Sequence, residues 1–265
     1  MKIFFLSIVS AASLALICSF VPHKKIKALQ AALPEQVYTP EKLNTQYTDH
    51  WTVKKCADFE IDGKGMNAIW ATTSWGVMTK LDPEGKPYVS KFKVLYSEKG
   101  LYILFAGEDD KITTKDYKDF EEIYEGDVFE VFFHPQKDKP QYFEYEINQL
   151  DKQLILTLVH TPGENVAWAP WNYEYRNKQI LKRKVDVAGG GKVVNGRIRS
   201  WTAELFFPYS IFGLLPGVPP KSGDTWDANF CRIDYDSGSQ VEWSWSKAIT
   251  TNFHDLDKLG AITFE

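Results

Sequence analysis

The chain of 265 residues is 44% hydrophobic and 25% charged, which is typical of a soluble globular protein and argues against intrinsic disorder. Its 31 basic and 35 acidic residues are spread without a basic stripe, which argues against nucleic acid as a partner. The length suits one all-β domain, because β-sandwiches often reach this size as single units. Nine Trp contribute to an aromatic content of 15%, and such rings either fill sandwich cores or offer flat faces to ligands.

The N-terminal segment predicts export to the periplasm, the cell surface or the medium. Lys2 precedes an uncharged apolar run over residues 3–21, the pattern of a signal peptide. Three outcomes stay open: cleavage of the signal, acylation at Cys18, and an uncleaved helix, since about nineteen apolar residues approach the ~20 that cross a bilayer. The predicted parts are a signal peptide or anchor over residues 1–21, a spacer over 22–50 and one domain over 51–265.

From about residue 51 onward, short strand patterns alternate with turns. Residues 98–100 between two of these strands predict a hairpin in which Gly100 takes a positive φ. Residues 208–213 predict one helical turn, and residues 114–123 predict a helical turn or an ordered loop. The predicted strands cover residues 92–96, 101–105, 127–133, 142–148, 152–160, 178–187, 197–207, 226–235, 241–246 and 261–264. Strands of this length and spacing predict a jelly-roll-like antiparallel β-sandwich of two sheets.

Seven blocks of sequence carry a family resemblance when they are taken in chain order. They are residues 61–63 with 69–70, 93–96 with 101–103, 126–132, 142–148, 201–205 with 208, 223–226 with 229–232, and 243–246 with 259–264. Together they resemble the family 9 carbohydrate-binding modules, specifically their stand-alone exported bacterial relatives. The resemblance implies a β-sandwich that binds sugar between aromatic rings, with structural calcium in some members.

One loop departs from the pattern of these relatives. Residues 109–125 lack the tryptophan that many of them carry there. Tyr117, Phe120 and Tyr124 are the candidate replacements for one half of the aromatic clamp.

A pair of indoles gives the first candidate sugar site. Trp168, Trp171 and Asn172 fall in a predicted loop whose small neighbours and Pro170 leave the rings room to project. A sugar needs flat rings against its C–H faces and side chains that donate and accept hydrogen bonds at its rim. The alternative is that one or both indoles pack under the loop as a small additional core.

The last third of the chain gives a second set of candidates. Trp243 and Trp245 share one strand face, which usually means core. Residues 250–254 nevertheless resemble the late binding loop of the family, so Trp245 is a candidate ring and Asn252 a candidate hydroxyl partner. Trp75 is a further candidate. Structural roles are predicted for Trp70, Trp201 and Trp226.

The acidic residues do not predict catalysis. Glu144 and Glu146 share one face of a strand whose other face is apolar, the pattern of a strand with one solvated side. Asp127 and Glu130 are three residues apart and therefore point to opposite faces. A glycosidase needs two carboxylates at a set separation across the scissile bond, and we predict no such pair.

Two further features leave alternatives open. Asp109, Asp110 and Asp127 offer oxygens of the kind that calcium prefers, but no EF-hand loop is present and a solvated acidic turn is the favoured explanation. Cys56 and Cys231 remain as a pair if Cys18 is lost or acylated, and an exported protein can bridge them as a disulfide. The alternative is two separate buried thiols.

We therefore predict non-catalytic binding of a glycan in support of polysaccharide catabolism, with no required cofactor, calcium as an option, and membrane contact only through the N-terminal segment. Three rival hypotheses remain. One is a haem-binding electron-transfer sandwich that uses Met66 or Met78 with His134, His160, His254 or a Lys as axial ligands. Another is a glycoside hydrolase or its accessory subunit, which would hydrolyse O-glycosyl bonds. The third is a plain surface adhesion domain without a sugar pocket.

Overall fold

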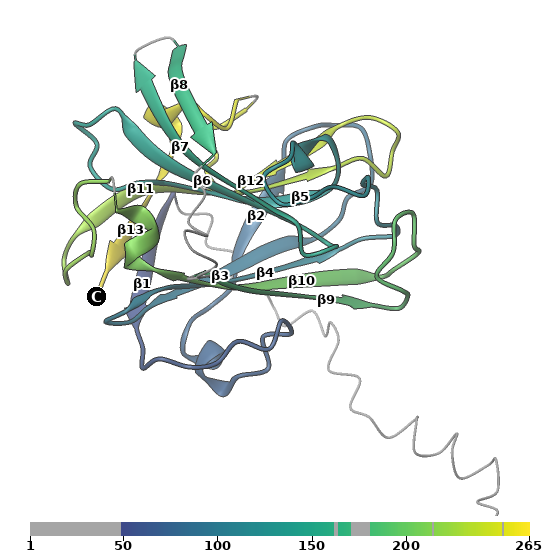
Figure 1. The fold of residues 1–265 in the computed structure, drawn as a ribbon, viewed down its shortest axis with the longest axis horizontal. Coiled ribbons are helices and arrows are strands. Elements are labelled where there is room, and N and C mark those ends of the chain that lie inside the picture. The colour runs from purple at the N-terminus through teal and green to yellow at the C-terminus, as the bar shows by residue number, and fades with distance from the viewer. Residues whose placement is uncertain (1–48, 162–163, 171–180, 214, 251) are drawn as a thin grey trace, which may run out of the picture. The chain divides into compact units, whose positions relative to one another are not determined.

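The computed structural model describes residues 49–161, 164–170, 181–213, 215–250 and 252–265 (Figure 1). The chain divides into two units, Met1–Leu43 and Asn44–Glu265, and all described residues belong to the second. No helix in the described ranges is long and apolar enough to cross a membrane.

The described residues of this second unit form thirteen β-strands. They are β1 His50–Lys55, β2 Gly76–Lys80, β3 Ser90–Tyr96, β4 Gly100–Glu108, β5 Val128–His134, β6 Gln141–Asn148, β7 Gln153–Thr161, β8 Glu164–Pro170, β9 Lys182–Ala188, β10 Ser200–Pro208, β11 Thr225–Asp234, β12 Val241–Ser244 and β13 Gly260–Phe264. The 3-10 helices are η1 Ala68–Thr72, η2 Ile123–Glu125, η4 Tyr209–Phe212 and η5 Leu256–Lys258.

The strands form two layers that pack face to face (Figure 1). Sheet A has the order β8-β7-β6-β5-β11-β12 with β13 also beside β11, and sheet B has the order β2-β3-β4-β10-β9. β12 pairs with β2 and thus joins the sheets at one side, while β1 pairs in parallel with both β13 and β3. All other strand pairs are antiparallel, so the predicted all-β sandwich is confirmed.

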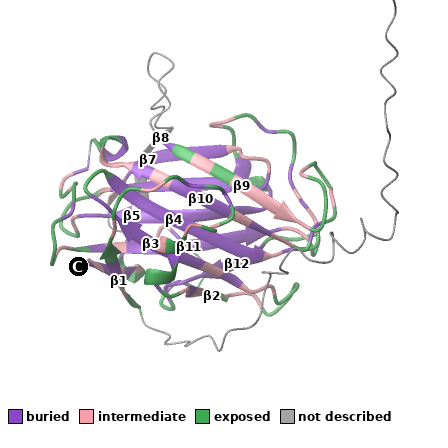
Figure 2. Cartoon of the chain, turned by 90° about the horizontal axis from the view of Figure 1, so that it is seen from below, coloured by how far each residue is buried: buried purple, intermediate pink, exposed green. Residues whose placement is uncertain are grey.

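The core lies between the two sheets. Phe143, Tyr145 and Ile147 of β6 are completely buried in it, as the two-residue alternation predicts. Phe92 of β3 and Phe230 of β11 stack with ring centroids 3.8 Å apart and so lock the layers together. Figure 2 shows the central strands buried, whereas the edge strand β9 is partly exposed. The predicted structural tryptophans Trp70, Trp201 and Trp226 are all buried.

Three strands differ from the sequence prediction. β1 buries only Val53 fully, so it has no apolar alternation and depends on its parallel backbone pairing. β2 has only five residues. β8 occupies residues for which Pro170 and two alanines indicated a loop, yet its backbone pairs with β7. In each case long-range pairing overrides a weak local signal.

The hairpin between β3 and β4 forms as predicted, but the prediction that Gly100 takes a positive φ is wrong. Gly100 is not among the glycines with positive φ. A Cβ at this position would instead overlap the carbonyl oxygen of Phe207, because β10 runs directly alongside β4 there. Gly100 therefore permits a close approach of two backbones.

We expect Gly100→Ala to destabilise the fold by about 1–3 kcal/mol, because backbone atoms must move to admit the methyl group. Urea denaturation followed by tryptophan fluorescence measures the loss. Gly191→Ala is the matched control, since an added Cβ at Gly191 meets no atom within 4 Å. Equal stability of the two variants would contradict this account of Gly100.

Candidate functional site

Three glutamates gather on the outer face of sheet A. Glu130 of β5 lies directly opposite Glu146 of β6 in the strand register, and Glu144 follows on the same face of β6. They point away from the core because alternate residues, such as Tyr145, point into it. Despite their outward direction, Glu130, Glu144 and Glu146 are only 3%, 4% and 1% exposed.

Loops bury this outer face. The loop before β5 contributes Tyr117 and Ile123, and the segment between β12 and β13 contributes Ile249, Phe253 and Leu256. These side chains pack with the outward residues of sheet A in a second hydrophobic cluster. The prediction that Glu144 and Glu146 occupy a solvated strand face is therefore wrong. The alternation within β6 is as predicted, but loops distant in sequence cover its polar side.

Burial without a counter-charge changes the acidity of these groups. It raises the pKa of Glu144 to about 7. Burial and the neighbouring carboxylates raise the pKa of Glu130 and Glu146 well above the ordinary value. The Oε2 atoms of Glu144 and Glu146 have no hydrogen-bond partner in the described part of the protein. Since an unpaired buried polar atom costs about 1–3 kcal/mol, these oxygens are strong candidates for ligand contact.

A histidine stands at the margin of this glutamate cluster (Glu130, Glu144 and Glu146). His254 Nδ1 lies 2.8 Å from the Tyr142 hydroxyl and 3.8 Å from Glu144 Oε2. Burial and the nearby His160 lower the pKa of His254 to about 4, so its ring is neutral near pH 7. Its side chain is 33% exposed, and it therefore connects the buried carboxylates with the surface.

Tyrosines supply the aromatic part of the margin. Tyr124 packs against the second hydrophobic cluster that covers the outer face of sheet A, and its pKa is raised to about 12 by burial and by Glu122 and Glu146. The Tyr235 hydroxyl donates a hydrogen bond to the carbonyl oxygen of Tyr124 at 3.1 Å and so helps to fix the loop. Of the three predicted replacements for the missing tryptophan, the half-buried Tyr124 is therefore best placed to present a ring.

Asn252 and Trp245, predicted together, are separated by the structure. Asn252 is exposed, and its Oδ1 accepts a hydrogen bond from the backbone N–H of His254 at 2.9 Å, which places it beside the glutamate cluster. Trp245 is 5% exposed and packs edge-on against Phe92 and Phe230 in the core. The prediction that Trp245 offers a free ring is corrected, because its strand face is the inner one.

The other predicted rings do not join this site within the described residues. Trp75 is half-buried on the outer face of sheet B, where the ammonium groups of Lys91 and Lys93 lie 4.3 and 4.9 Å from its ring centroid. Trp168 lies in β8 opposite Leu158, but its side chain is outside the described part. Trp171 and Asn172 lie outside the described residues altogether, so their contact with a ligand stays a prediction.

The two domain cysteines are free thiols. Cys231 is buried beside Glu130 in the strand register, and Cys56 is partly buried next to the outer face of sheet B. Burial raises the pKa of Cys56 to about 11 and that of Cys231 well above its ordinary value. Both thiols are therefore protonated near neutral pH and poor nucleophiles.

The residues of the haem hypothesis are dispersed. Met66 is 60% exposed, whereas Met78 is buried in the core between the sheets. His134 lies on the outer face of sheet A, with its Nε2 2.6 Å from the Lys139 carbonyl oxygen. These side chains do not form an axial pair around a common cavity.

The acidic residues proposed for calcium are arranged around an arginine. Asp109, Asp234 and Asp236 bring carboxylate oxygens within 4.8 Å of one another, whereas Asp110 points outward to Lys86. The buried Arg232 donates from Nη2 to Asp109 at 3.2 Å and to Asp234 at 2.6 Å. Both oxygens of Asp127 accept hydrogen bonds from protein N–H groups. A protein cation is thus already a partner of two of these carboxylates, and calcium binding by Asp109, Asp110 and Asp127 stays a prediction.

We expect Arg232→Met to destabilise the fold by about 3–5 kcal/mol, because it strands two buried carboxylates. Lys86→Met, which breaks a partly exposed ion pair, is the control and should cost less than about 1 kcal/mol. Thermal denaturation with calcium and with EDTA should give the same midpoint for the wild type. A clear rise of the denaturation midpoint with calcium would contradict the role of Arg232 as the cation of these carboxylates.

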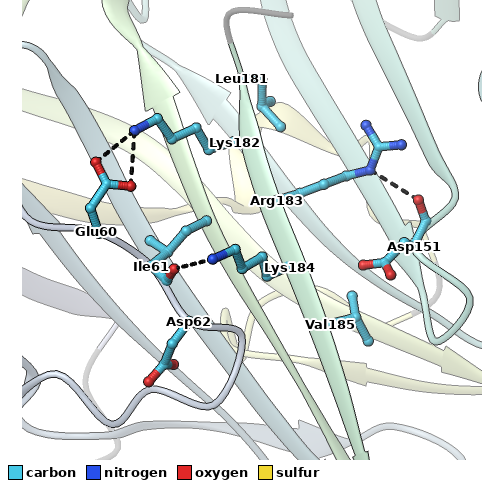
Figure 3. A pocket seen from close by; sticks show the side chains of 9 residues that line it. All are labelled: Glu60, Ile61, Asp62, Asp151, Leu181, Lys182, Arg183, Lys184 and Val185. Atoms are coloured by element: carbon cyan, nitrogen blue, oxygen red, sulfur yellow. Dashed lines mark hydrogen bonds and ion pairs between the residues drawn. The ribbon is translucent and has the colours of Figure 1, made fainter. Parts of the chain in front are cut away.

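A surface depression of about 520 Å³ lies elsewhere, along the edge strand β9 (Figure 3). Lys182 pairs there with Glu60, and Lys184 donates to the carbonyl oxygen of Ile61. None of its lining residues is aromatic, and its cations already have protein partners. It therefore lacks the rings of the outer face of sheet A, although Asp151 Oδ1 in its lining has no hydrogen-bond partner in the described residues.

The glutamate cluster makes stability depend on pH. The pKa of Glu144 is about 7 in the folded chain against 4.5 for the ordinary side chain, so its contribution is full below pH 4.5 and is lost as pH rises through 7. Because Gln stays neutral, we expect Glu144→Gln to be more stable than wild type at pH 8 by on the order of 1–3 kcal/mol, and similar at pH 5.

Urea denaturation at the two pH values measures this difference. Glu98→Gln is the control, since Glu98 is 82% exposed and should change stability by less than about 0.5 kcal/mol at either pH. A Glu144→Gln variant that is destabilised equally at both pH values would contradict the assigned acidity.

The fold and the site define the chain as a two-sheet β-sandwich with a closed polar site on one outer face. It belongs to the carbohydrate family 9 binding domain-like family, whose model matches residues 61–265. The resemblance drawn from the seven sequence blocks is thus confirmed. No curated protein shows significant similarity to the chain.

Solved structures share the fold at low sequence identity. A proposed carbohydrate-binding protein from Bacteroides uniformis is 18% identical, with a TM-score of 0.67 over 82% of this chain and 99% of its own. A family 9 carbohydrate-binding module from Caldicellulosiruptor kristjanssonii, in complex with glucose, is 14% identical, with a TM-score of 0.53 over 82% of this chain and 95% of its own. The cellotriose complex of a family 9 module from the same organism has the same identity and TM-score, over 82% of this chain and 93% of its own.

Proposed function

We propose that the protein binds carbohydrate, without cleaving it, on the outer face of sheet A. The observation that carries this proposal is the pair of unpaired, buried oxygens of Glu144 and Glu146 on a sheet face that aromatic side chains cover. A carboxyl group accepts hydrogen bonds from hydroxyls when ionised and can also donate one when protonated. Membership of the family, and the glucose and cellotriose complexes of a structural relative, support this choice of ligand.

In this proposal each part of the site has a separate role. The glutamate cluster holds hydroxyl groups, while Tyr124 packs against the apolar face of a sugar ring. His254 and Asn252, at the exposed margin, contact the next part of the glycan. Because the carboxylates are almost completely buried, the ligand gains access when the partly exposed margin side chains move aside. No acid–base reaction is assigned to the glutamates.

We also propose that this binding takes place outside the cytoplasm and serves polysaccharide breakdown by other enzymes. Lys2 and the apolar run over residues 3–21 support export. An exported module that holds a glycan without cutting it is useful where separate enzymes degrade that glycan.

A glycan array with purified protein tests the proposal. We expect Glu146→Gln to weaken retention at least tenfold, because an amide N–H₂ that cannot accept a hydrogen bond replaces a carboxyl oxygen in a buried site. Tyr124→Ala should weaken it about 3- to 10-fold through loss of ring contact. Trp171→Ala tests the sequence-predicted loop on the same array.

Glu60→Gln, on the loop beside sheet B, is the matched control and should bind like wild type. Far-ultraviolet circular dichroism and melting midpoints check that each variant folds. Unchanged retention by folded Glu146→Gln and Tyr124→Ala would remove this face from the site. Release of reducing sugar from any retained glycan would overturn the non-catalytic assignment.

A further inference from the structure

We infer that the sugar held by the glutamate cluster carries a free ammonium group, so that the ligand is an amino sugar rather than a neutral one. This inference rests on the proposed function. It names the chemical class of ligand that the same site selects.

In the part of the chain that the structure describes, the glutamate cluster has no cationic partner. Within the described residues, every charged side chain that acts on Glu130, Glu144 or Glu146 is acidic, and Glu242 of β12 adds to their repulsion. The neighbouring titratable groups are neutral near pH 7, namely Tyr124, Tyr235, Cys231 and His254. The glutamate cluster therefore takes up protons instead of pairing with a protein cation, and a cationic ligand can take the place of those protons.

The buried carboxylates elsewhere in the protein have internal partners. Asp109 and Asp234 have Arg232 of β11 as a cationic partner. Glu204 accepts hydrogen bonds from the N–H groups of Asp62, Gly63 and the Trp70 indole. At Glu144 and Glu146 the Oε2 atoms have no such partner in the described residues, and a raised pKa keeps protons on these carboxyl groups, so they offer acceptor atoms to a cation brought by the ligand.

The N–H donors of an ammonium group match the acceptor oxygens of the glutamate cluster. An ammonium group carries three N–H donors and no acceptor. Glu144 Oε2 and Glu146 Oε2 are free to accept, and Glu130 lies directly opposite Glu146. Hydrogen bonds between an ammonium and carboxylates are about twice as strong as those between neutral groups. A hydroxyl in the same position carries no charge and therefore does not favour the ionised carboxylates.

Isothermal titration calorimetry of the wild type at pH 6.5, with EDTA present, tests this inference. The probes are a glucosamine trisaccharide with free amines, its fully N-acetylated form and cellotriose. We expect the free-amine sugar to bind at least tenfold more tightly than either neutral sugar, because only it makes charge-assisted hydrogen bonds. Its binding should release protons, since the ammonium favours ionised glutamates, and titration in two buffers of different ionisation enthalpy counts them.

Variants separate the site from general surface attraction. Glu146→Gln should lower the affinity for the amine sugar to that for the N-acetylated form, whereas Glu60→Gln should leave the preference intact. A preference lost equally in both variants would overturn the inference in favour of diffuse charge attraction.

The remaining outcomes distinguish the inference from the proposed function. Two results would overturn the amino-sugar inference and leave carbohydrate binding standing. One is that cellotriose binds as tightly as the free-amine sugar. The other is that both sugars release the same number of protons on binding. Failure of all three sugars here, together with no retention on the glycan array, would overturn both.

Discussion

The register of β5 against β6 places two carboxylates of like charge, Glu130 and Glu146, directly opposite each other on one sheet face. Such a pair is destabilising, and sliding either strand by one residue would turn its core residues outward. The register is fixed because Phe143 and Tyr145, on the inner face of β6, are completely buried in the core. The hydrophobic core therefore forces the carboxylates together, and the acidity of the site follows from this constraint.

The fold treats its two buried acidic clusters differently. Around Arg232, every nearby aspartate has a cation or backbone N–H groups as partners, which makes that cluster part of the framework. On the outer face of sheet A, the carboxylates of Glu144 and Glu146 retain unpaired oxygens under a cover of loop side chains. Proteins commonly sacrifice stability at a functional site in this way, because a site that satisfies itself has nothing left to offer a ligand.

Sequence reasoning succeeded where one strand carries its own signal. The alternation in β6 predicted that Phe143 and Ile147 face the core, and the family resemblance covered most of the domain. It failed where the answer depends on distant segments. Nothing within β6 reveals that Phe253 covers the face of Glu144, and nothing near Gly100 reveals that β10 lies against it. The prediction for Trp245 was wrong because the resemblance of residues 250–254 to a binding loop was given more weight than the core-facing position of Trp245.

Protons and ligand compete for the same oxygens at the glutamate cluster. In the free protein, burial and mutual repulsion favour the protonated state of Glu130 and Glu146, so folding is coupled to proton uptake. A cationic ligand reverses that preference, because its charge replaces the proton as the partner of the carboxylates. Binding to the folded state then stabilises it by mass action, most where the unliganded cluster is most strained, above neutral pH. The site that costs the fold stability is thus the one through which a ligand restores it.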